Sequence, residues 1–336
     1  MTARFNRGTG LLVINVVNSN PNGDPDAESE PRTFESDGRG LISPVSFKRK
    51  IRDLMEDESG EVRMAALSAA GASGQNHAFH ILESRGRERE VIKAMPLEEF
   101  RAKYWDGRVF GNTFVEKKIA DVEETDTDVN DTDADVEHHD TSSKNKKKRG
   151  KKKDAGSDTN KKKSFITTGV VQIGPGVSIS PVQIERLTLT NKAGVEADKD
   201  RGMAPLAFRI VRHGLYVMPF FVNPSAAAKS GCDARDIDIL KFLIPHAYSH
   251  TASAIRPQVE IVHAWYAEHK TPLGSCPDPL LLDALRPKRR NSADSEEPSN
   301  TIADYDIPTT LPDHLSARLA SFEDLASKAW PLHAAA

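Results

Sequence analysis

The sequence is poor in cysteine and aromatic residues, and it lacks the local signatures of the common catalytic sites. Its two cysteines, Cys232 and Cys276, are too few for a disulfide framework or a four-thiolate zinc site. It has no nucleophile elbow, HExxH helix, P-loop or dinucleotide fingerprint. No stretch reaches the ~18 apolar residues of a membrane span, and the first residues do not resemble a signal peptide. These absences predict a cytoplasmic protein without a metal, cofactor, membrane association or catalytic centre.

The near neutrality of the chain hides a strong separation of charge. The formal net charge is −3, yet residues 121–140 contain ten acidic residues and residues 144–163 are rich in lysine. Such a segment has almost no apolar surface to bury, so it cannot offset the entropy lost on ordering. We therefore predict that residues 121–163 form a disordered, charged insertion in a surface loop.

Apolar patterning divides the rest of the chain into strands and helices. Residues 10–17 are nearly continuous in apolar side chains, which is typical of a strand buried on both faces. Further strand-like runs occupy residues 165–173, 182–190 and 208–222, and the last two flank a polar tip that predicts a long hairpin. Helices are predicted at residues 45–57, 97–104, 233–256 with a break at Pro245, and 315–329. This interleaving favours an α+β fold.

Two neighbouring segments carry the strongest polar signal. The loop NSNPNGDPD, residues 18–26, follows the first strand and can expose backbone N–H groups to phosphate or ribose oxygens. The helix that follows carries a basic face formed by Lys48, Arg49, Lys50 and Arg52. Because lysine and arginine give sequence-independent affinity for nucleic acid, the two segments together predict a phosphate-binding track. The basic face alone is also typical of an ordinary solvated surface.

Two other patterns resemble metal sites but leave them incomplete. The asparagines of the loop fall on the first ligand positions of a calcium loop, but Ser29 stands where a glutamate is required. His246 and His250 are four residues apart and can share a helix face, but no third ligand lies near them in the sequence. We expect no metal at either place.

Several motifs occur in a distinctive order. NSNPNGDPD with VSFKRKIRD (residues 45–53) is followed by WDGRVFGN (105–112), GVVQI (169–173), RHGLY (212–216) and SAIR (253–256). Together they resemble the backbone subunit of type I CRISPR effector complexes, a family of the RAMP superfamily, and in particular its I-C and I-B branches. The resemblance covers roughly residues 10–285 in the order of the family.

The resemblance implies an α+β fold with an RRM-like, ferredoxin-like palm and a long β-hairpin thumb. The palm would comprise residues 1–120 and 164–285, with the thumb at about 188–209. The insertion 121–163 would interrupt it, and residues 286–336 would form a polar linker and a C-terminal tail.

The resemblance also implies a noncatalytic role in antiviral defence. Copies of the family's subunit stack in a helical array along the CRISPR RNA, beside the other effector subunits, and the guide bases pair with target DNA. A methionine at the thumb tip would act as an apolar wedge between bases. The residues expected to contact RNA are Asn20, Asn22, Gly23, Lys48, Arg49, Arg52, Arg108, Lys199, Arg201, Met203 and Arg256.

Two other functions stay open. Type III relatives of the superfamily cut target RNA with an aspartate in a comparable loop, so Asp24 or Asp26 would serve a metal-dependent endoribonuclease. Pro25 between them stiffens the loop and argues against this function. The third function is that of a solitary RNA-binding module that uses the lysine-rich tract.

Overall fold

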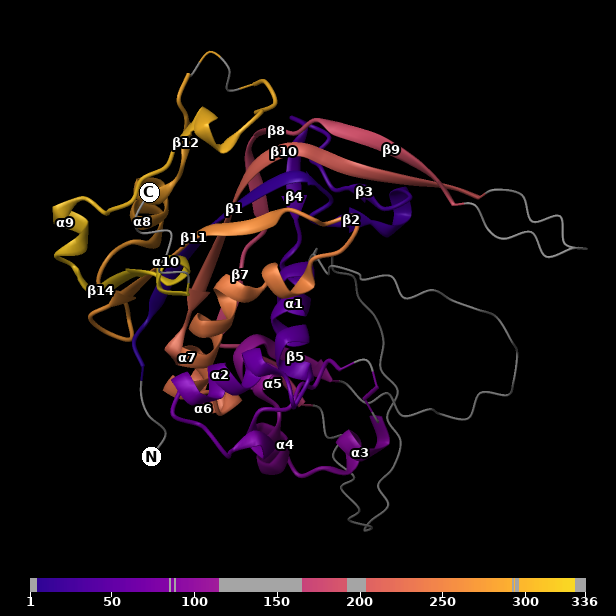
Figure 1. Ribbon diagram of the computed structural model, residues 1–336. Helices are drawn as coiled ribbons and strands as arrows, with labels where there is room; N and C mark the ends of the chain where they lie inside the picture. Colours follow the sequence, from indigo (N-terminus) through magenta and orange to yellow (C-terminus); the bar gives the residue numbers. More distant parts are fainter. Residues whose placement is uncertain are drawn as a thin grey trace, which may run out of the picture. The chain divides into compact units, whose positions relative to one another are not determined.

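A large antiparallel sheet organises the chain, and its interior strand β1 (Gly8–Ser19) is formed by the apolar run near the N-terminus (Figure 1). β1 pairs with β10 (Ala204–Val222) on one side and with β11 (Val259–His269) on the other. The strand order is β14-β11-β1-β10-β8-β4, and β7 and β9 also pair with β10. These outer strands are β4 (Arg39–Ile42), β7 (Val171–Ile173), β8 (Gly176–Pro181), β9 (Ile184–Asn191) and β14 (Leu319–Asp324).

The computed structural model describes residues 5–84, 86–87, 89–114, 165–191, 204–291, 293 and 296–329. The chain divides into two units, Met1–Thr113 with Ile166–Ala336, and Phe114–Phe165, and the large sheet belongs to the first. The predicted insertion 121–163 and the tip of the predicted thumb lie outside the described residues. The predicted domain boundaries stay a prediction.

Both faces of β1 are covered, which explains why its apolar residues are continuous rather than alternating. Leu12 and Ile14 belong to a core shared with helices on one side of the sheet, whereas Leu11 and Val13 belong to a second core shared with helices on the other side. Successive side chains of a strand point to opposite faces, so one strand supplies both cores. Figure 1 shows the corresponding helices on the two sides of the sheet.

The helices of the first side are α1 (Pro44–Glu56), α2 (Glu61–Ala69), α3 (Arg89–Ala94), α4 (Leu97–Lys103), α5 (Trp105–Phe110), α6 (Ala227–Ser230), α7 (Ala234–Leu243) and α10 (Leu325–Ala329). On the second side are α8 (Asp278–Leu285) and α9 (Asp313–Ser316). Three short strand pairs complete the described fold: β2 (Gly23–Asp24) with β3 (Glu30–Pro31), β5 (Gly111–Phe114) with β6 (Phe165–Thr168), and β12 (Lys288–Arg289) with β13 (Tyr305–Asp306).

Helix α1 forms where the sequence predicts it. Ser43 is its N-cap, and the Oγ atom of Ser43 accepts a hydrogen bond from the backbone N–H of Ser46 at 3.2 Å. Pro44 occupies the first helical turn, where its missing N–H is tolerated. Phe47 and Ile51 are fully buried, so the apolar face of α1 packs into the first core as expected.

The packing of β1 against its neighbours depends on a glycine. A Cβ atom at Gly10 would lie 2.1 Å from the ring of Phe220 on β10. The Phe220 ring in turn stacks on Tyr266 of β11, with ring centroids 6.1 Å apart. Any larger residue at Gly10 would force this stacked pair apart, because ring atoms occupy the space.

The sequence predicted the elements unevenly. The hairpin of β9 and β10, the helices α1 and α4, and the break of the 233–256 helix at Pro245 are confirmed. Strands β8 and β11 and helix α8 were not predicted. The predicted helix at 315–329 is wrong over residues 319–324, because these residues pair as edge strand β14 with β11. The α+β class is confirmed as a mixed fold with a large antiparallel sheet; the RRM-like palm stays a prediction.

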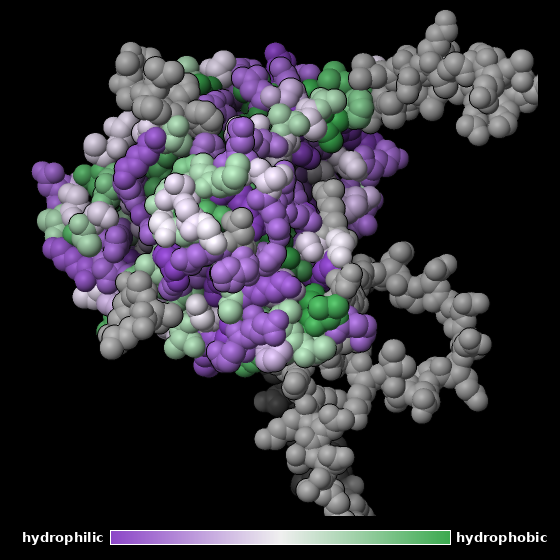
Figure 2. Space-filling model, turned by 60° about the horizontal axis from the view of Figure 1, so that its bottom comes forward, coloured by the Kyte–Doolittle hydropathy of each residue, from purple (hydrophilic) through white to green (hydrophobic). Residues whose placement is uncertain are grey.

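Figure 2 shows the face that carries α3 and α4, where hydrophilic residues are interrupted by smaller hydrophobic patches. Met64, Val91 and Leu97 are the exposed large apolar side chains of α2, α3 and α4. Within the described residues, no helix combines the length and apolar character needed to cross a membrane.

Candidate nucleic-acid interface

The loop that follows β1 is held in place by the amide of Asn20. The Nδ2 atom of this residue donates to the carbonyls of Ser29, at 2.7 Å, and Arg209, at 3.2 Å. Its backbone N–H donates to the carbonyl of Ile255 at 2.8 Å. Asn20 is only 2% exposed, so it joins the loop to β10 and to the segment before β11. Its contact with RNA stays a prediction, and its amide NH₂ already donates to the protein.

Asn22 and Gly23 connect the same loop to helix α1. The Oδ1 atom of Asn22 accepts a hydrogen bond from the backbone N–H of Ser43, the N-cap of α1, at 2.7 Å. Gly23 leaves no room for a side chain, because a Cβ atom there would lie 2.9 Å from the carbonyl oxygen of Ser29. The loop and the start of α1 are therefore one preorganised surface, as the two neighbouring motifs predict.

Arg256 closes this surface from a distant part of the sequence. Its Nε atom donates to the backbone carbonyl of Asn20 at 2.9 Å. A tight turn positions Arg256, because its backbone N–H donates to the carbonyl of Ser253 at 2.8 Å. The structure thus brings together Asn20, Asn22, Gly23 and Arg256, which the sequence motifs named separately.

Lys50 lies beside Arg256 and is the most unusual charged residue of the surface. It is 6% exposed, and its Nζ atom lies 5.2 Å from the ring centroid of Tyr248. Within the described residues, Lys50 forms no hydrogen bond and no ion pair. Burial and the positive charge of Arg256 lower its pKa to about 8, although the carboxylate of Asp53 opposes the shift. A buried cation without an anionic partner is costly, which suits a site that receives an anion.

Unpaired polar atoms accompany this cation. Neither the buried hydroxyl of Tyr248 nor the Oδ1 atom of Asn20 has a hydrogen-bond partner in the part of the chain that the structure describes. Buried polar groups normally are hydrogen-bonded, so these two atoms are available to a bound ligand. We name Lys50, Arg256, Asn20 and Tyr248 the cation cluster.

Lys50 was part of the predicted basic face, but it was not predicted to have a separate role. The helical period places Lys50 on the buried face of α1, because it lies three residues after Phe47 and four before Leu54, and both of these are buried. A cation on the apolar stripe of a helix is the signal that distinguishes Lys50 from its neighbours. Tyr248 was not predicted and carries no comparable signal.

The other basic residues of α1 are engaged by the protein. Arg52 donates from Nε to Oδ2 of Asp106 at 2.8 Å, and its guanidinium lies 5.4 Å from the ring centroid of Phe110. Lys48 shares this ring, with Nζ 5.5 Å from the centroid, and burial together with the charge of Arg52 lowers its pKa. Only Lys48 of this group is not ion-paired within the described chain.

Arg49 faces two carboxylates rather than an empty surface. Its Nε atom donates to Asp53 at 2.7 Å, it also pairs with Glu56, and its guanidinium donates to the carbonyl of Glu83 at 2.6 Å. One positive and two negative charges leave this part of α1 acidic. We therefore leave Arg49 out of the interface.

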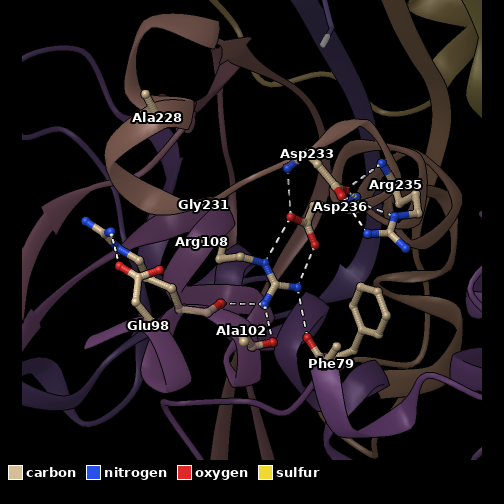
Figure 3. Close-up of a pocket in the computed structure, with 11 residues that line it drawn as sticks. Phe79, Glu98, Ala102, Arg108, Ala228, Gly231, Asp233, Arg235 and Asp236 are labelled. Carbon is tan, nitrogen blue, oxygen red and sulfur yellow. Dashed lines mark hydrogen bonds and ion pairs between the residues drawn. The ribbon is translucent and has the colours of Figure 1, made fainter. Parts of the chain in front are cut away.

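Arg108 of α5 is directed at Asp236 of α7 (Figure 3). It is 6% exposed and binds both carboxylate oxygens of Asp236, at 2.7 and 3.0 Å. Its remaining N–H groups donate to the carbonyls of Ala78, Arg101 and Ala102. It lines a cleft of about 390 Å³, but its donors are all used. The structure gives Arg108 a packing role, and we leave it out of the interface as well.

The thumb residues Lys199, Arg201 and Met203 lie outside the described residues, so their contacts stay predictions. The base of the hairpin is described: Arg209 pairs with Glu28 at 2.8 Å and Glu30 at 3.4 Å. These ion pairs connect β10 to the loop that follows β1.

The loop aspartates do not assemble a metal site within the described residues. Asp24 accepts a hydrogen bond from the backbone N–H of Asp26 at 3.1 Å and lies 3.3 Å from Arg32, while Asp26 is exposed. His246 and His250 also have no third metal-ligating neighbour in the described part of the chain. No observation here favours the metal-dependent nuclease.

Comparison with known proteins gives a local sequence match and two distant structural ones. CRISPR-associated protein Cas7 of Haloferax volcanii is 35% identical over 58 residues, so the match spans only 17% of this chain and 17% of that relative. One similar solved chain is described as a CRISPR RNA-guided surveillance complex, pre-nicking, with 11% identity, a TM-score of 0.40 and 78% of both chains covered. Another, from a CRISPR RNA-guided surveillance complex, has 13% identity, a TM-score of 0.34 and coverage of 84% of this chain and 78% of that one.

A family model gives a match of far greater extent. The model described as CRISPR-associated protein Cas7 matches residues 6–310, which include β1, the loop after it, α1 and Arg256. Since this match spans most of the sequence, the chain belongs to the CRISPR-associated protein Cas7 family.

Proposed function

We propose that this chain binds CRISPR RNA without catalysis, as the repeated backbone subunit of a type I CRISPR surveillance complex. The guide bases would stay available for pairing with target DNA, while the protein holds the RNA backbone. Membership of a CRISPR-associated family supports a role in a CRISPR system. The observation that carries the RNA contact is Lys50, a buried cation beside Arg256 that forms no ion pair among the described residues.

We propose that a phosphate group of the RNA binds between Lys50 and Arg256. Burying Lys50 next to another cation destabilises the free protein, and an anion placed between the two charges would offset that cost. A phosphodiester has the required charge, and contact with it does not depend on base identity. RNA bound in this way is held by its backbone, which suits a guide whose sequence changes.

The preorganised loop supports the same function. Asn20 and Asn22 fix the loop after β1 to β10 and to the start of α1, so Arg256 and Lys50 keep their positions before RNA arrives. Preorganisation lowers the entropy that is lost on binding. The cations are therefore presented as a site rather than as mobile surface side chains.

The hairpin of β9 and β10 suits the proposed thumb. β10 is 19 residues long and extends past its pairing with β1 to pair with β9, and the hairpin leads away from the sheet (Figure 1). We propose that its tip places Lys199, Arg201 and Met203 on RNA, with Met203 separating two bases. The rest of the sheet would then be the RRM-like palm.

The palm and thumb are unlike surfaces, and joining unlike surfaces of identical copies gives an open array. We propose that copies of the chain follow one another along the CRISPR RNA, next to the other effector subunits. RNA length then sets the number of copies, because each copy occupies a fixed number of nucleotides.

Salt dependence of RNA binding tests the phosphate contact. Replacing Lys50 and Arg256 together by alanine should lower the slope of log K against log salt by about 1.4, at ~0.7 per single-strand contact. The loss of affinity should be the same for unrelated RNA sequences. A matched control replaces two exposed cations away from the cation cluster, Lys229 and Arg286, and should leave the slope unchanged. An unchanged slope for the Lys50 and Arg256 variant would refute the contact.

Particle mass tests the assembly. On guide RNAs of increasing length, the mass of the complex should rise in steps of one protomer, and removal of residues 192–203 should abolish regular steps. One protomer on RNA of every length would leave only the solitary RNA-binding module.

Incubation of the assembled complex with complementary RNA and magnesium tests the proposal that the chain is not a nuclease. Periodic cuts in the RNA would favour the metal-dependent endoribonuclease.

A further inference from the structure

Three aromatic rings form a ladder along the segment that leads from α7 to Arg256. They are the rings of Phe242, His246 and His250, which are spaced four residues apart. The centroids of Phe242 and His246 are 5.2 Å apart, with 36° between the ring planes. Those of His246 and His250 are 5.8 Å apart at 64°. These distances lie in the range of favourable aromatic contacts.

The ladder runs from the interior to the surface. Phe242 and His246 are half-buried, whereas His250 is exposed. Local hydrogen bonds fix the backbone that carries the rings: the hydroxyl of Ser249 donates to the carbonyl of His246 at 3.1 Å, and the backbone N–H of Thr251 donates to the carbonyl of Tyr248 at 3.0 Å. The outer ring is therefore supported from below and open to a flat partner.

The ladder adjoins the cation cluster along the chain. The Nζ atom of Lys50 lies over the ring of Tyr248, which stands between the two histidines in the sequence. Arg256 follows His250 by six residues, so the two cannot be more than about 20 Å apart even if the chain were extended. The turn at Ser253–Arg256 shortens this separation. A single strand held at the cluster needs only a few nucleotides to reach His250.

We propose that His250 is a stacking platform for an unpaired nucleobase of the RNA strand whose phosphates bind at Lys50 and Arg256. The inference rests on the proposed RNA-binding function and adds a second kind of contact to it. Single-strand binding sites combine cations that follow the backbone with aromatic rings on which bases stack. Because every base has a π-face, such stacking holds a guide without restricting its sequence.

An RNA base is favoured over a protein side chain as the occupant by the position of the ladder. The rings come directly before the turn that presents Arg256, and the cluster requires an anion that a nucleotide carries with its base. One strand can therefore occupy both places, whereas an apolar peptide would leave Lys50 and Arg256 unpaired.

Fluorescence of 2-aminopurine tests the stacking directly. This base analogue is placed at successive positions of a short single-stranded RNA and bound to the full-length chain. One position should show quenching in the wild type that is lost in His250→Ala, and this variant should bind RNA about tenfold more weakly, within the range known for one base. His250→Phe should restore both signals, because a ring without charge retains the platform. His77→Ala removes another exposed histidine and should change neither.

The outcomes separate this inference from the function on which it rests. Equal affinity and equal fluorescence for His250→Ala and the wild type at every position would overturn the stacking platform. If the Lys50 and Arg256 variant still lowered the salt slope in the same assay, the proposed function would stand without the platform. Failure of the wild type to bind RNA would overturn both.

Discussion

Lys50 and Arg256, two cations 206 positions apart in the sequence, are neighbours in the folded chain. Burial of Lys50 and the charge of Arg256 lower the pKa of Lys50 to about 8. Arg256 is held near it by a hydrogen bond to the backbone carbonyl of Asn20, and it forms no ion pair with a carboxylate of the described residues. Keeping two like charges together lowers the stability of the protein, and such a cost indicates a functional site. The effect on stability can be measured.

Replacing Lys50 by methionine should stabilise the protein in the absence of RNA. Methionine fills similar space without charge, so the variant avoids an unpaired buried cation. We expect the free energy of unfolding to rise by about 1–2 kcal/mol, measured by denaturant titration at pH 7. Lys229→Met, at an exposed lysine, should change it by less than ~0.5 kcal/mol. A loss of stability in Lys50→Met would mean that the cation has a partner.

The sign of this effect with pH follows from the lowered pKa. Between about pH 8 and 10.5, the unfolded chain carries a proton on Lys50 that the folded chain has lost. Wild-type stability from this group therefore rises with pH across that window, and the penalty is fully present below about pH 8. The advantage of Lys50→Met should shrink as the pH approaches 10.

RNA binding should show the opposite trend. A phosphate raises the pKa of Lys50, so binding takes up a proton when the pH exceeds about 8. At pH 9 a lysine with that pKa is protonated in roughly one molecule in ten, so affinity should fall by up to about tenfold between pH 7 and 9. Lys50→Arg keeps its charge across this range and should lack the fall. Equal pH dependence in both proteins would count against a phosphate at Lys50.

The sequence predicted which segments lie together better than it predicted the contacts of their residues. The loop 18–26, helix α1 and the SAIR motif do meet, because hydrophobic patterning and turn residues specify β1 and α1 locally. What local patterns do not specify is which cations are paired. Arg52 meets Asp106 across 54 positions, and this contact depends on tertiary packing. The helical period was the signal that could have distinguished the two residues, because it places Lys50, and not Arg49, on the apolar face of α1.

Strand β11 is a part of the fold that local sequence patterns do not specify. Its burial alternates only in part, and it carries polar residues such as Glu260, His263 and Glu268 among the apolar ones. The strand is stabilised by its position between β1 and β14, which pair with it from distant parts of the chain. Tertiary contacts of this kind outweigh local strand propensity.

Arg49→Ala should leave the salt slope of RNA binding unchanged, because Asp53, Glu56 and the carbonyl of Glu83 already occupy its guanidinium. We expect a loss of stability of at most about 1 kcal/mol, since the ion pairs are partly exposed. Binding measured over 50–300 mM salt checks the slope. A fall of ~0.7 would restore Arg49 to the interface.

Arg108→Met should destabilise the fold and leave the RNA contact intact. The substitution leaves the carboxylate of Asp236 buried without its cation and removes donors from the carbonyls of Ala78, Arg101 and Ala102. Breaking a buried pair in this way costs about 3–5 kcal/mol. Unfolding by denaturant should show this loss, while the folded fraction binds RNA with the wild-type salt slope.

A double variant separates packing from RNA contact. Arg108→Met with Asp236→Leu removes both charges, so no carboxylate stays buried without a partner, and the combined loss of stability should be smaller than the sum of the two single losses. Arg101→Ala, at a half-buried arginine of the same cleft, should cost much less, because its ion pair with Glu98 is largely exposed. If Arg108 contacted phosphate, the salt slope would fall in both Arg108 variants while the double variant recovered stability. We expect the recovery of stability and no change in the slope.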